Sequence, residues 1–301
     1  MRVAAVQTTA SHDRRQNLHD AGELVRVAAE DGAELVVLPE YFSVAGSPEH
    51  LRTYAETLSG PTVTWASELA SRWNVRILAG SIPELPVAAG SSGRHTGGRL
   101  FNTSCLLGPN GSLEAVYRKV HLFDVELEGV PFRESATIAP GDQLCVTPLG
   151  RSSPEGGPAT AVLGLSICYD LRFPEIFRIM ALGGATVIAV PAAFTAATGP
   201  SHWELLLRAR AAENQVFVIG AAQVGDLPPG MPSCHGHSMI VDPWGTVIAE
   251  LGDPGPGVIL ADLDFERQRR IRSQLPVLAN RRPAAYRWPH DDAWGSTERR
   301  G

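Results

Sequence analysis

The order of the apolar segments is the feature of this sequence that most constrains its fold. Short runs typical of buried strands alternate with segments whose apolar residues recur at helical spacing, and this series ends in a hairpin. Roughly the same order, strand–helix–strand–helix–strand–hairpin, occurs again in the second half without repeating the sequence. We therefore predict an α/β protein in which two similar sheets face each other and helices cover the outside, a four-layer αββα sandwich.

The predicted elements alternate along the whole chain. In the first half they are strands at 2–8, 34–40 and 75–81, helices at 17–31 and 61–73, and a hairpin at 100–107 and 112–120. In the second half they are strands at 143–148, 161–167, 185–190, 216–222 and 258–264, helices at 202–214 and from 174 and 265 onward, and a hairpin at 237–242 and 246–251. The remaining segments are predicted loops at 83–98, 124–141, 150–158, 194–199 and 224–234.

Composition narrows the class of protein. A chain of 301 residues with 44% apolar residues can bury a large core, and the absence of any apolar run of about 18 residues argues against a membrane span. The N-terminus enters a strand-like run directly, and four cysteines in so long a chain form no disulfide framework, so we expect reduced thiols in the cytoplasm. The net charge of −6, without charged blocks, argues against nucleic acid as a partner.

We predict a single domain at residues 1–275. Residues 276–301 are rich in Arg and Pro, and we expect a C-terminal tail that is extended or wrapped on a partner, with about ten terminal residues disordered. The apolar residues of 202–214 spread around that helix, which indicates burial on more than one side, as at a contact with a second subunit. The arginines of 267–272 are expected on a solvated helix face.

Cys168 stands where a predicted strand meets a predicted helix. The apolar run from Ala161 to Ile167 ends at this cysteine, and Pro174 suits the first turn of the helix that follows. A thiol at such a turn can reach a cleft, and unpaired backbone N–H groups of the helix start can face it. This is where a nucleophile would be placed, although a small buried hydrophobic residue is an equally good interpretation of the segment alone.

Two other reactive side chains follow strands. Glu40 comes at the end of the strand 34–40, where a carboxylate can face a cleft or else lie in a solvated loop. Lys119 ends the second strand of the first hairpin and is the only lysine among 26 Lys and Arg residues. Because the chain uses arginine for its other cations, this lysine indicates a place that requires a compact ammonium, with chance as the alternative.

A carboxylate, an ammonium and a thiol on one face of the sandwich can carry out acyl transfer. A free thiol has a pKa of about 8.5 and is mostly neutral, so the carboxylate takes the S–H proton as the sulfur attacks and later gives it to a leaving amine. The ammonium and the backbone N–H of Tyr169 can stabilise the oxyanion, at about 3–4 kcal/mol for each donor. Water then cleaves the thioester with the same base. No phosphate-cradling, dinucleotide-binding or thiol-pair motif occurs.

Three segments carry a resemblance to a known family. Leu38-Pro39-Glu40, the segment 117–124 and the segment 164–175 resemble, in the same order, the three signature segments of the nitrilase superfamily of carbon–nitrogen hydrolases. The segments 193–204 and 236–245 resemble its Nit branch, which holds omega-amidases and deaminated-glutathione amidases. The resemblance covers nearly the whole chain and implies the αββα fold, homodimers or higher homo-oligomers, no cofactor, and hydrolysis of a small amide that carries a carboxylate.

Carried over by motif, the resemblance implies a role for each catalytic residue. Glu40 corresponds to the general base, Cys168 to the nucleophile, and Lys119 to the oxyanion stabiliser, which acts with the Tyr169 N–H. Glu134, in Phe-Arg-Glu-Ser, corresponds to the second glutamate of the family, which orders the lysine and the substrate. All of these residues are therefore expected to lie in one pocket.

The resemblance also indicates residues that bind substrate. Arg172 and Thr198 match positions that bind the substrate carboxylate in this branch, and arginine suits a bidentate carboxylate contact. A structural ion pair is the alternative for Arg172. We place Phe194 with them, although this residue, Tyr41 and Phe42 can equally line the pocket or pack in the core.

The segment Cys234-His235-Gly236-His237 is the one group that suggests a metal. Two histidines and one cysteine need further ligands, and no second cluster is evident, so we expect polar residues at a loop edge and no metal. The sequence thus predicts a cysteine-dependent amidohydrolase. A hydrolase of nitriles, N-carbamoyl amines or aliphatic amides is one alternative, and a thiol sensor or metal-binding protein of the same architecture is the other.

Overall fold

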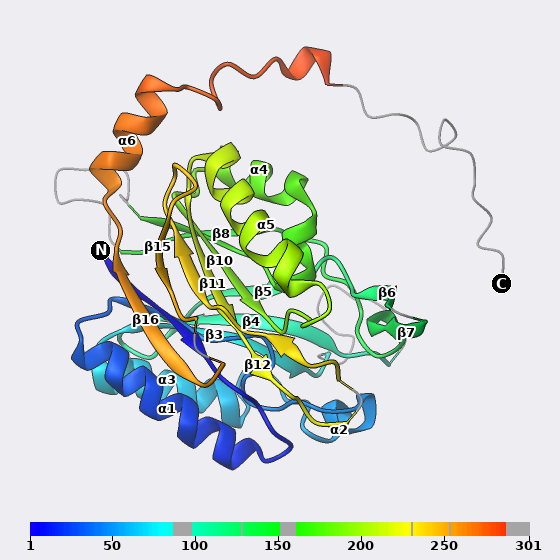
Figure 1. Ribbon diagram of the computed structural model, residues 1–301. Coiled ribbons are helices and arrows are strands. Elements are labelled where there is room, and N and C mark those ends of the chain that lie inside the picture. Colours follow the sequence, from blue (N-terminus) through cyan, green and yellow to red (C-terminus); the bar gives the residue numbers. More distant parts are fainter. Residues whose placement is uncertain (87–97, 128, 151–160, 230, 253, 287–301) are drawn as a thin grey trace.

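The computed structural model describes residues 1–86, 98–127, 129–150, 161–229, 231–252 and 254–286. Two six-stranded sheets lie face to face in it, with helices on the two outer faces (Figure 1). Helices α1 and α3 cover the first sheet, and helices α4 and α5 cover the second. The prediction of a four-layer αββα sandwich is confirmed.

The first sheet has the strand order β16-β1-β2-β3-β4-β5. Its strands are β1 (Arg2–Gln7), β2 (Leu35–Val37), β3 (Arg76–Glu84), β4 (Phe101–Leu107), β5 (Leu113–Arg118) and β16 (Gly257–Asp262). The strands β1, β2 and β3 are parallel, and two successive antiparallel pairings, β3 with β4 and β4 with β5, make β5 run in the same direction as β2. The chain segments after β2 and β5 therefore leave the sheet at the same edge.

The second sheet has the strand order β15-β14-β11-β10-β9-β8. Its strands are β8 (Cys145–Pro148), β9 (Val162–Leu165), β10 (Val187–Ala192), β11 (Phe217–Ala222), β14 (Met239–Val241) and β15 (Val247–Glu250). The central strands β9, β10 and β11 are parallel, and they are apolar and buried except at Val162, where β9 begins, as expected for strands covered on both faces. A parallel bridge between Thr8 and Gln223 joins the ends of β1 and β11, so the carboxyl ends of the parallel strands of both sheets lie on one side of the molecule.

Alternation along the strands divides the apolar residues between layers. On β1, Val3 and Ala5 belong to the core that the two sheets share, whereas Ala4 and Val6 pack toward α1 and α3.

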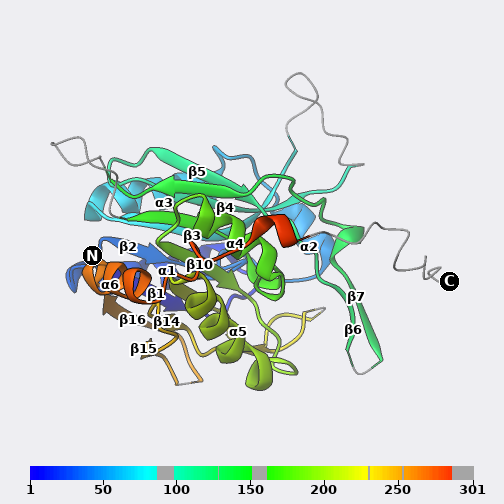
Figure 2. The same ribbon diagram turned by 90° about the horizontal axis from the view of Figure 1, so that it is seen from above.

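The longer helices are α1 (Arg14–Glu30), α3 (Pro61–Trp73), α4 (Pro174–Leu182), α5 (Gly199–Asn214) and α6 (Phe265–Gln274). The view from above shows the layers from a second direction (Figure 2).

A glycine allows the segment before Glu40 to pack closely on β3. A Cβ atom on Gly80 would lie 1.8 Å from the carbonyl oxygen of Pro39 and 2.5 Å from that of Leu38. Any other residue at position 80 would therefore push the Pro39–Glu40 segment away from the sheet. Close backbone contact thus fixes the position of the segment that follows β2 and carries Glu40.

Several short elements correct the predicted loops. The segment 124–141 contains the hairpin β6 (Asp124–Leu127) and β7 (Val130–Arg133) and the 3-10 helix η1 (Glu134–Ala136). The segment 224–234 pairs at its ends through β12 (Val224–Gly225) and β13 (Cys234–His235), and helix α2 (Pro48–Thr53) was not predicted. Helix α5 begins at Gly199 and α1 at Arg14, three residues before the predicted starts in both cases, and β3 continues through Glu84 into the predicted loop. Residues 87–97 of the predicted loop 83–98 and residues 151–158 of the predicted loop 150–158 lie outside the described residues.

Beyond α6 the chain passes through a turn at residues 277–280, where the Asn280 N–H donates to the Pro276 carbonyl at 2.9 Å, and then forms the 3-10 helix η3 (Pro283–Ala285). The predicted disorder of the last residues falls at 287–301, outside the described residues. The domain boundary at residue 275 stays a prediction. In the part of the chain that the structure describes, no helix is long and apolar enough to cross a membrane.

Candidate active site

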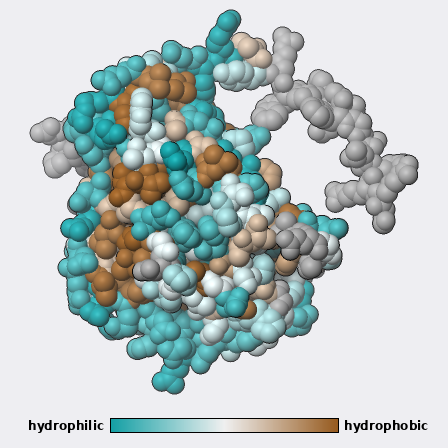
Figure 3. Space-filling view, in the orientation of Figure 1, coloured by the Kyte–Doolittle hydropathy of each residue, from teal (hydrophilic) through white to brown (hydrophobic). Residues whose placement is uncertain are grey.

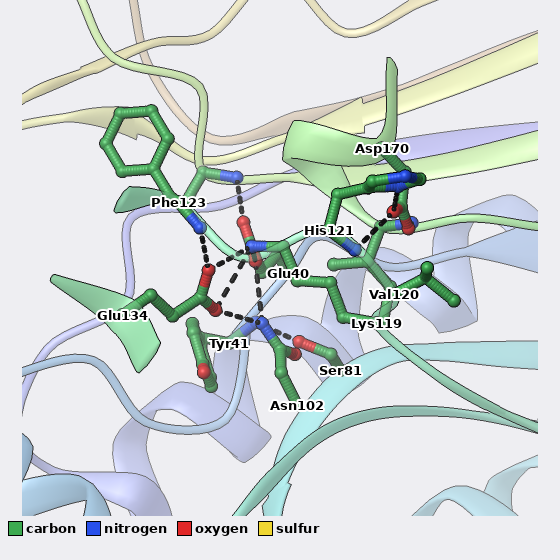
Figure 4. Close-up of polar contacts among 12 residues, drawn as sticks. Glu40, Tyr41, Ser81, Asn102, Lys119, Val120, His121, Phe123, Glu134 and Asp170 are labelled. Carbon is green, nitrogen blue, oxygen red and sulfur yellow. Dashed lines mark hydrogen bonds and ion pairs between the residues drawn. The ribbon is translucent and has the colours of Figure 1, made fainter. Parts of the chain in front are cut away.

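A pocket of about 180 Å³ opens where the strands of both sheets end. Glu40, Lys119, Glu134 and Cys168 all line it, and Arg172 lies in the same wall. Figure 4 shows Glu40, Lys119 and Glu134 pointing toward one another from three separate segments. The structure therefore brings the four predicted catalytic residues together.

Glu40 is held by donors from three parts of the chain. Its Oε1 accepts hydrogen bonds from Lys119 Nζ at 3.0 Å and from Asn102 Nδ2 at 2.8 Å, and its Oε2 accepts one from the Ala193 N–H at 2.9 Å. The side chain is almost fully buried, so these bonds take the place of water around the carboxylate. Gln223 donates to the Glu40 carbonyl and fixes its backbone as well.

Lys119 directly follows β5 and reaches into the pocket, where only 2% of the residue is exposed. Besides its bond to Glu40, Nζ lies 2.9 Å from Glu134 Oε2 and 3.1 Å from Glu134 Oε1. Burial alone would lower the pKa of this lysine, but the carboxylates of Glu134 and Glu40 raise it well above its ordinary value. Lys119 is therefore a permanent cation in the pocket.

Glu134 begins the 3-10 helix η1, directly after β7. Its Oε2 accepts a hydrogen bond from the Phe123 N–H at 2.7 Å, and Asn102 Nδ2 lies 3.2 Å from its Oε1. Because Asn102 and Lys119 each contact both glutamates, the two carboxylates have fixed positions relative to the ammonium. Glu134 therefore lies beside Lys119, and its role in ordering the lysine stays a prediction.

Cys168 has a strained backbone at the start of the 3-10 helix η2 (Cys168–Arg172). Its φ of +47° lies in the left-handed region, which residues other than glycine seldom adopt and which is enriched at functional sites. Burial raises the pKa of its thiol well above the ordinary value, the Glu40 carboxylate raises it further, and the Lys119 ammonium and the Ala193 N–H oppose this. The thiol is therefore neutral at rest, and a base would have to remove its proton for it to act as a nucleophile.

Tyr169 follows Cys168 as the second residue of η2 and also lines the pocket. The first N–H groups of a helix have no partner within the helix, so the Tyr169 N–H stands at a position suited to an oxyanion. Lys119 supplies a second donor from the opposite sheet. Lys119 and Tyr169 thus both line the pocket, and their role as oxyanion donors stays a prediction.

Arg172 and Thr198 form a second polar region of the pocket, and the ring of Phe194 lies beside it. The Arg172 guanidinium donates to Thr198 Oγ1 and contacts His202 Nδ1, both at 3.2 Å, and its Cζ lies 5.0 Å from the centre of the Phe194 ring and 5.9 Å from that of Tyr169. Among the described residues, no carboxylate lies within ion-pair distance of Arg172. The structural ion pair considered as the alternative is therefore not seen there.

The sequence did not reveal Asn102, which contacts both glutamates of the site, and it left the place of Tyr41 undecided. Asn102 was missed because its role depends on its position in β4, next to the segment that carries Lys119: the Lys119 N–H donates to the Asn102 carbonyl at 2.9 Å. Tyr41 lines the pocket and has a φ of +53°, and its buried hydroxyl has no hydrogen-bond partner among the described residues. Phe42, in contrast, packs against Trp65 in the core beneath α1 and α3. The sequence signal for Tyr41 was its place directly after Glu40.

The residues Cys234, His235 and His237 are engaged in other contacts. The two histidine rings stack with their centres 4.4 Å apart, and His237 Nδ1 lies 2.8 Å from Glu250 Oε1. Cys234 is buried in β13, and burial raises the pKa of its thiol. Within the described ranges, no group of three or more His, Cys, Asp or Glu side chains is arranged to hold a metal ion.

Known proteins resemble this chain over nearly its full length. A deaminated glutathione amidase from Synechocystis sp. is 42% identical over 93% of this chain and 97% of its own length, and an omega-amidase from Homo sapiens is 37% identical over 95% and 96%. The crystal structure of Saccharomyces cerevisiae Nit3, a member of branch 10 of the nitrilase superfamily, matches with a TM-score of 0.77 and 33% identity over 92% of this chain and 94% of that one.

A further solved structure concerns the cysteine. It is a glutamate-to-glutamine mutant of an amidase from Nesterenkonia sp. AN1, in which the acetamide moiety of fluoroacetamide is covalently added at the active-site cysteine. This chain matches it with a TM-score of 0.71 and 28% identity over 94% of both chains. The family model for carbon-nitrogen hydrolases matches residues 2–273. With this match and these relatives, the chain belongs to the carbon-nitrogen hydrolase family.

Proposed function

We propose that this enzyme hydrolyses the C–N bond of a small amide that carries a carboxylate, through a thioester on Cys168. The observation that supports this most is the single pocket in which a buried ammonium, two carboxylates and a thiol on a strained turn meet. Similarity to relatives named deaminated glutathione amidase and omega-amidase favours the same reaction.

The first half of the reaction forms the thioester. Glu40 accepts the proton of the Cys168 thiol as the sulfur bonds to the amide carbon, and the carbonyl oxygen becomes an oxyanion. The Lys119 ammonium and the Tyr169 N–H donate to this oxyanion. Glu40 then gives the proton to the amide nitrogen, the C–N bond breaks, and ammonia or an amine leaves.

The second half of the reaction returns the free enzyme. Water enters, Glu40 accepts one of its protons, and the oxygen attacks the thioester carbon, where the same two donors hold the new oxyanion. The C–S bond breaks, the sulfur recovers its proton from Glu40, and the acid product leaves. Glu134 and Asn102 do not exchange protons in this scheme, and they keep Lys119 and Glu40 in place.

The carboxylate preference rests on Arg172. A guanidinium in the pocket wall, bonded to Thr198 and His202 and without an acidic partner among the described residues, can bind an anion through both of its NH2 groups. Phe194 and Tyr169 flank it and limit its movement. A substrate carboxylate at this point would leave its amide free to reach Cys168.

Ammonia release from a matched panel tests this proposal. We expect hydrolysis of succinamate, a four-carbon amide with a terminal carboxylate, to exceed that of butanamide by about 10- to 100-fold in kcat/KM, as expected for hydrogen bonds to a charged group. Preference for 3-cyanopropanoate or for N-carbamoyl-β-alanine at the same enzyme concentration would indicate one of the alternative activities instead. Equal rates on succinamate and butanamide would contradict the carboxylate preference.

The variant Arg172→Met tests the residue that we assign to this preference. It should lower kcat/KM for succinamate by about 10- to 100-fold, because the carboxylate loses its charged partner, and should change that for butanamide by less than about threefold. Arg172→Lys, which keeps the charge but not the planar fork, should fall between. Equal losses of kcat/KM on both amides would indicate that Arg172 maintains the structure of the pocket and does not bind the substrate carboxylate.

We also propose a homodimer in the cytoplasm. Support for the dimer comes from large apolar side chains that are exposed on the outer helices, Ile179 and Leu182 on α4 and Leu205 on α5. Trp244 and Ile248 are exposed at the hairpin β14–β15, and Figure 3 shows apolar patches among hydrophilic surface on this face. Sedimentation velocity at micromolar concentration should give the mass of two chains, and a single-chain mass would exclude the dimer.

A further inference from the structure

Asp170 is a fully buried carboxylate outside the set of residues described above. It accepts hydrogen bonds from Tyr117 Oη at 2.7 Å, the His121 N–H at 3.0 Å and the Ile167 N–H at 2.9 Å, and His121 Nδ1 lies 2.8 Å from it. It is not among the residues that line the pocket. Its partners come from two segments that are about 50 residues apart in sequence, one at the end of β5 in the first sheet and one after β9 in the second.

These bonds lie on both sides of each reactive residue. Tyr117 and His121 stand two residues before and two residues after Lys119, and both contact Asp170. Ile167 directly precedes Cys168, and Asp170 itself stands two residues after it. Figure 4 shows Asp170 and His121 beside the backbone of Val120, next to Lys119. One carboxylate thus joins the lysine segment to the cysteine turn.

The Asp170 bonds also stabilise the strained turn. The φ of +47° at Cys168 is unfavourable for a residue with a side chain and persists only where the surroundings enforce it. The bond from the Ile167 N–H to Asp170 Oδ2 and the bond from the Asp170 N–H to the Ile167 carbonyl at 3.1 Å close the turn around Cys168. The same Oδ2 accepts the Tyr117 hydroxyl from the other sheet.

We propose that Asp170 is a positioning residue for the amidase reaction, and that it holds the Lys119 ammonium and the Cys168 sulfur at the spacing which the oxyanion requires. This inference rests on the proposed function. Asp170 contacts neither substrate nor the reacting atoms, and it acts through the backbone on each side of those two residues. A displacement of about 1 Å in such a site can lower the rate by about 100-fold.

The variant Asp170→Asn tests this role with little change of shape. The two backbone N–H groups bond to different carboxylate oxygens, His121 to Oδ1 and Ile167 to Oδ2, and an amide offers only one oxygen. One of the two segments therefore loses its bond. We expect kcat for succinamate to fall by about 100-fold, with KM within about threefold because Arg172 is untouched.

Asp242→Asn is the matched control. Asp242 is also buried, and its Oδ1 accepts the Trp244 and Thr246 N–H groups at 2.9 Å, but it lies in the β14–β15 turn and does not line the pocket. This variant should lower the melting temperature and leave kcat per folded enzyme at the wild-type value. If Asp170→Asn behaves in the same way, with only the melting temperature lowered, the positioning role is wrong.

Two further measurements keep the test decisive. If Asp170→Asn does not fold, Tyr117→Phe removes one of the bonds and keeps the carboxylate, and we expect a fall in kcat of about fivefold at constant KM. Wild-type kcat in that variant would overturn the proposal.

If wild-type enzyme cleaves no amide of the panel, the proposed function fails instead. The rate at which iodoacetamide alkylates Cys168, measured by mass spectrometry of the peptide that contains it, should then be lower in Asp170→Asn than in Asp242→Asn, and equal rates would overturn the positioning role by itself.

Discussion

Replacement of Cys168 by serine should lower kcat for succinamate by about 10⁴-fold or more while the protein stays folded. A hydroxyl is a much weaker nucleophile than a thiol, and Glu40 would have to remove a proton from a group of far higher pKa. The loss corresponds to about 5.5 kcal/mol of transition-state stabilisation. Ammonia release gives the activity, and circular dichroism with a thermal melt gives the folded fraction.

The matched control for this prediction is Cys234→Ser. Cys234 is buried like Cys168 and close to the pocket, since its neighbour Pro232 lines it, and its sulfur lies 3.8 Å from the Pro232 carbonyl. Neither Lys119 nor a glutamate carboxylate bonds to it in the structure. This variant should keep wild-type kcat within about threefold. If Cys168→Ser retains more than a tenth of the wild-type rate, the thioester scheme must be abandoned.

The sequence predicted the three reactive residues because each of them ends a recognisable element. Glu40 and Cys168 follow apolar runs typical of buried strands, and Lys119 ends the second strand of a hairpin with a clear turn. Parallel strands end at a common edge, so three strand ends suggested one site before any contact was known. The elements themselves follow from periodicity, which is strong in segments such as β10 and α3.

Glu134 could be assigned only through the family resemblance. It follows the hairpin β6–β7, whose strands have four residues each, include a proline, and lie in a segment without a long apolar run. Such short strands are stabilised by their pairing and not by their composition, so the segment was predicted as a loop. The place of Glu134 beside Lys119 then depends on the Phe123 N–H bond, which no local pattern reveals.

Asn102 and Asp170 show a second limit of sequence reasoning. Both are polar residues within otherwise buried segments, and each acts by bonding to chain segments that are distant in sequence. A buried polar residue must find hydrogen-bond partners, but the sequence does not say which.

Helix α2 was missed for another reason: its start signals, Ser47 as N-cap and Pro48 in the first turn, are present, but six residues show no clear period.

Replacement of Lys119 by arginine should also remove most activity, although the charge is kept. Lys119 Nζ has three N–H bonds and lies within 3.1 Å of one oxygen of Glu40 and two of Glu134. If the two Glu134 oxygens share one N–H, one donor remains for the oxyanion. A guanidinium is larger and planar, and in a place where 2% of the lysine is exposed its fork must enter the space of the substrate.

We expect kcat for Lys119→Arg to fall by about 10³-fold, equal to about 4 kcal/mol, with a melting temperature near that of the wild type. The matched control is the opposite exchange at the preceding residue, Arg118→Lys. Arg118 bonds to Glu84 through Nε and one NH2 group, both at 2.6 Å, and lies outside the pocket lining, so this variant should keep kcat within about threefold.

A third variant, Lys119→Gln, separates charge from shape. If the site requires only a positive charge between the two glutamates, arginine should restore much of the activity that glutamine loses. If it requires a compact donor beside the sulfur, arginine and glutamine should both be about 10³-fold slower than lysine. The second outcome would explain why a chain in which 25 of the 26 Lys and Arg residues are arginine keeps one lysine. Near-normal turnover by Lys119→Arg would show instead that arginine can replace lysine at this position.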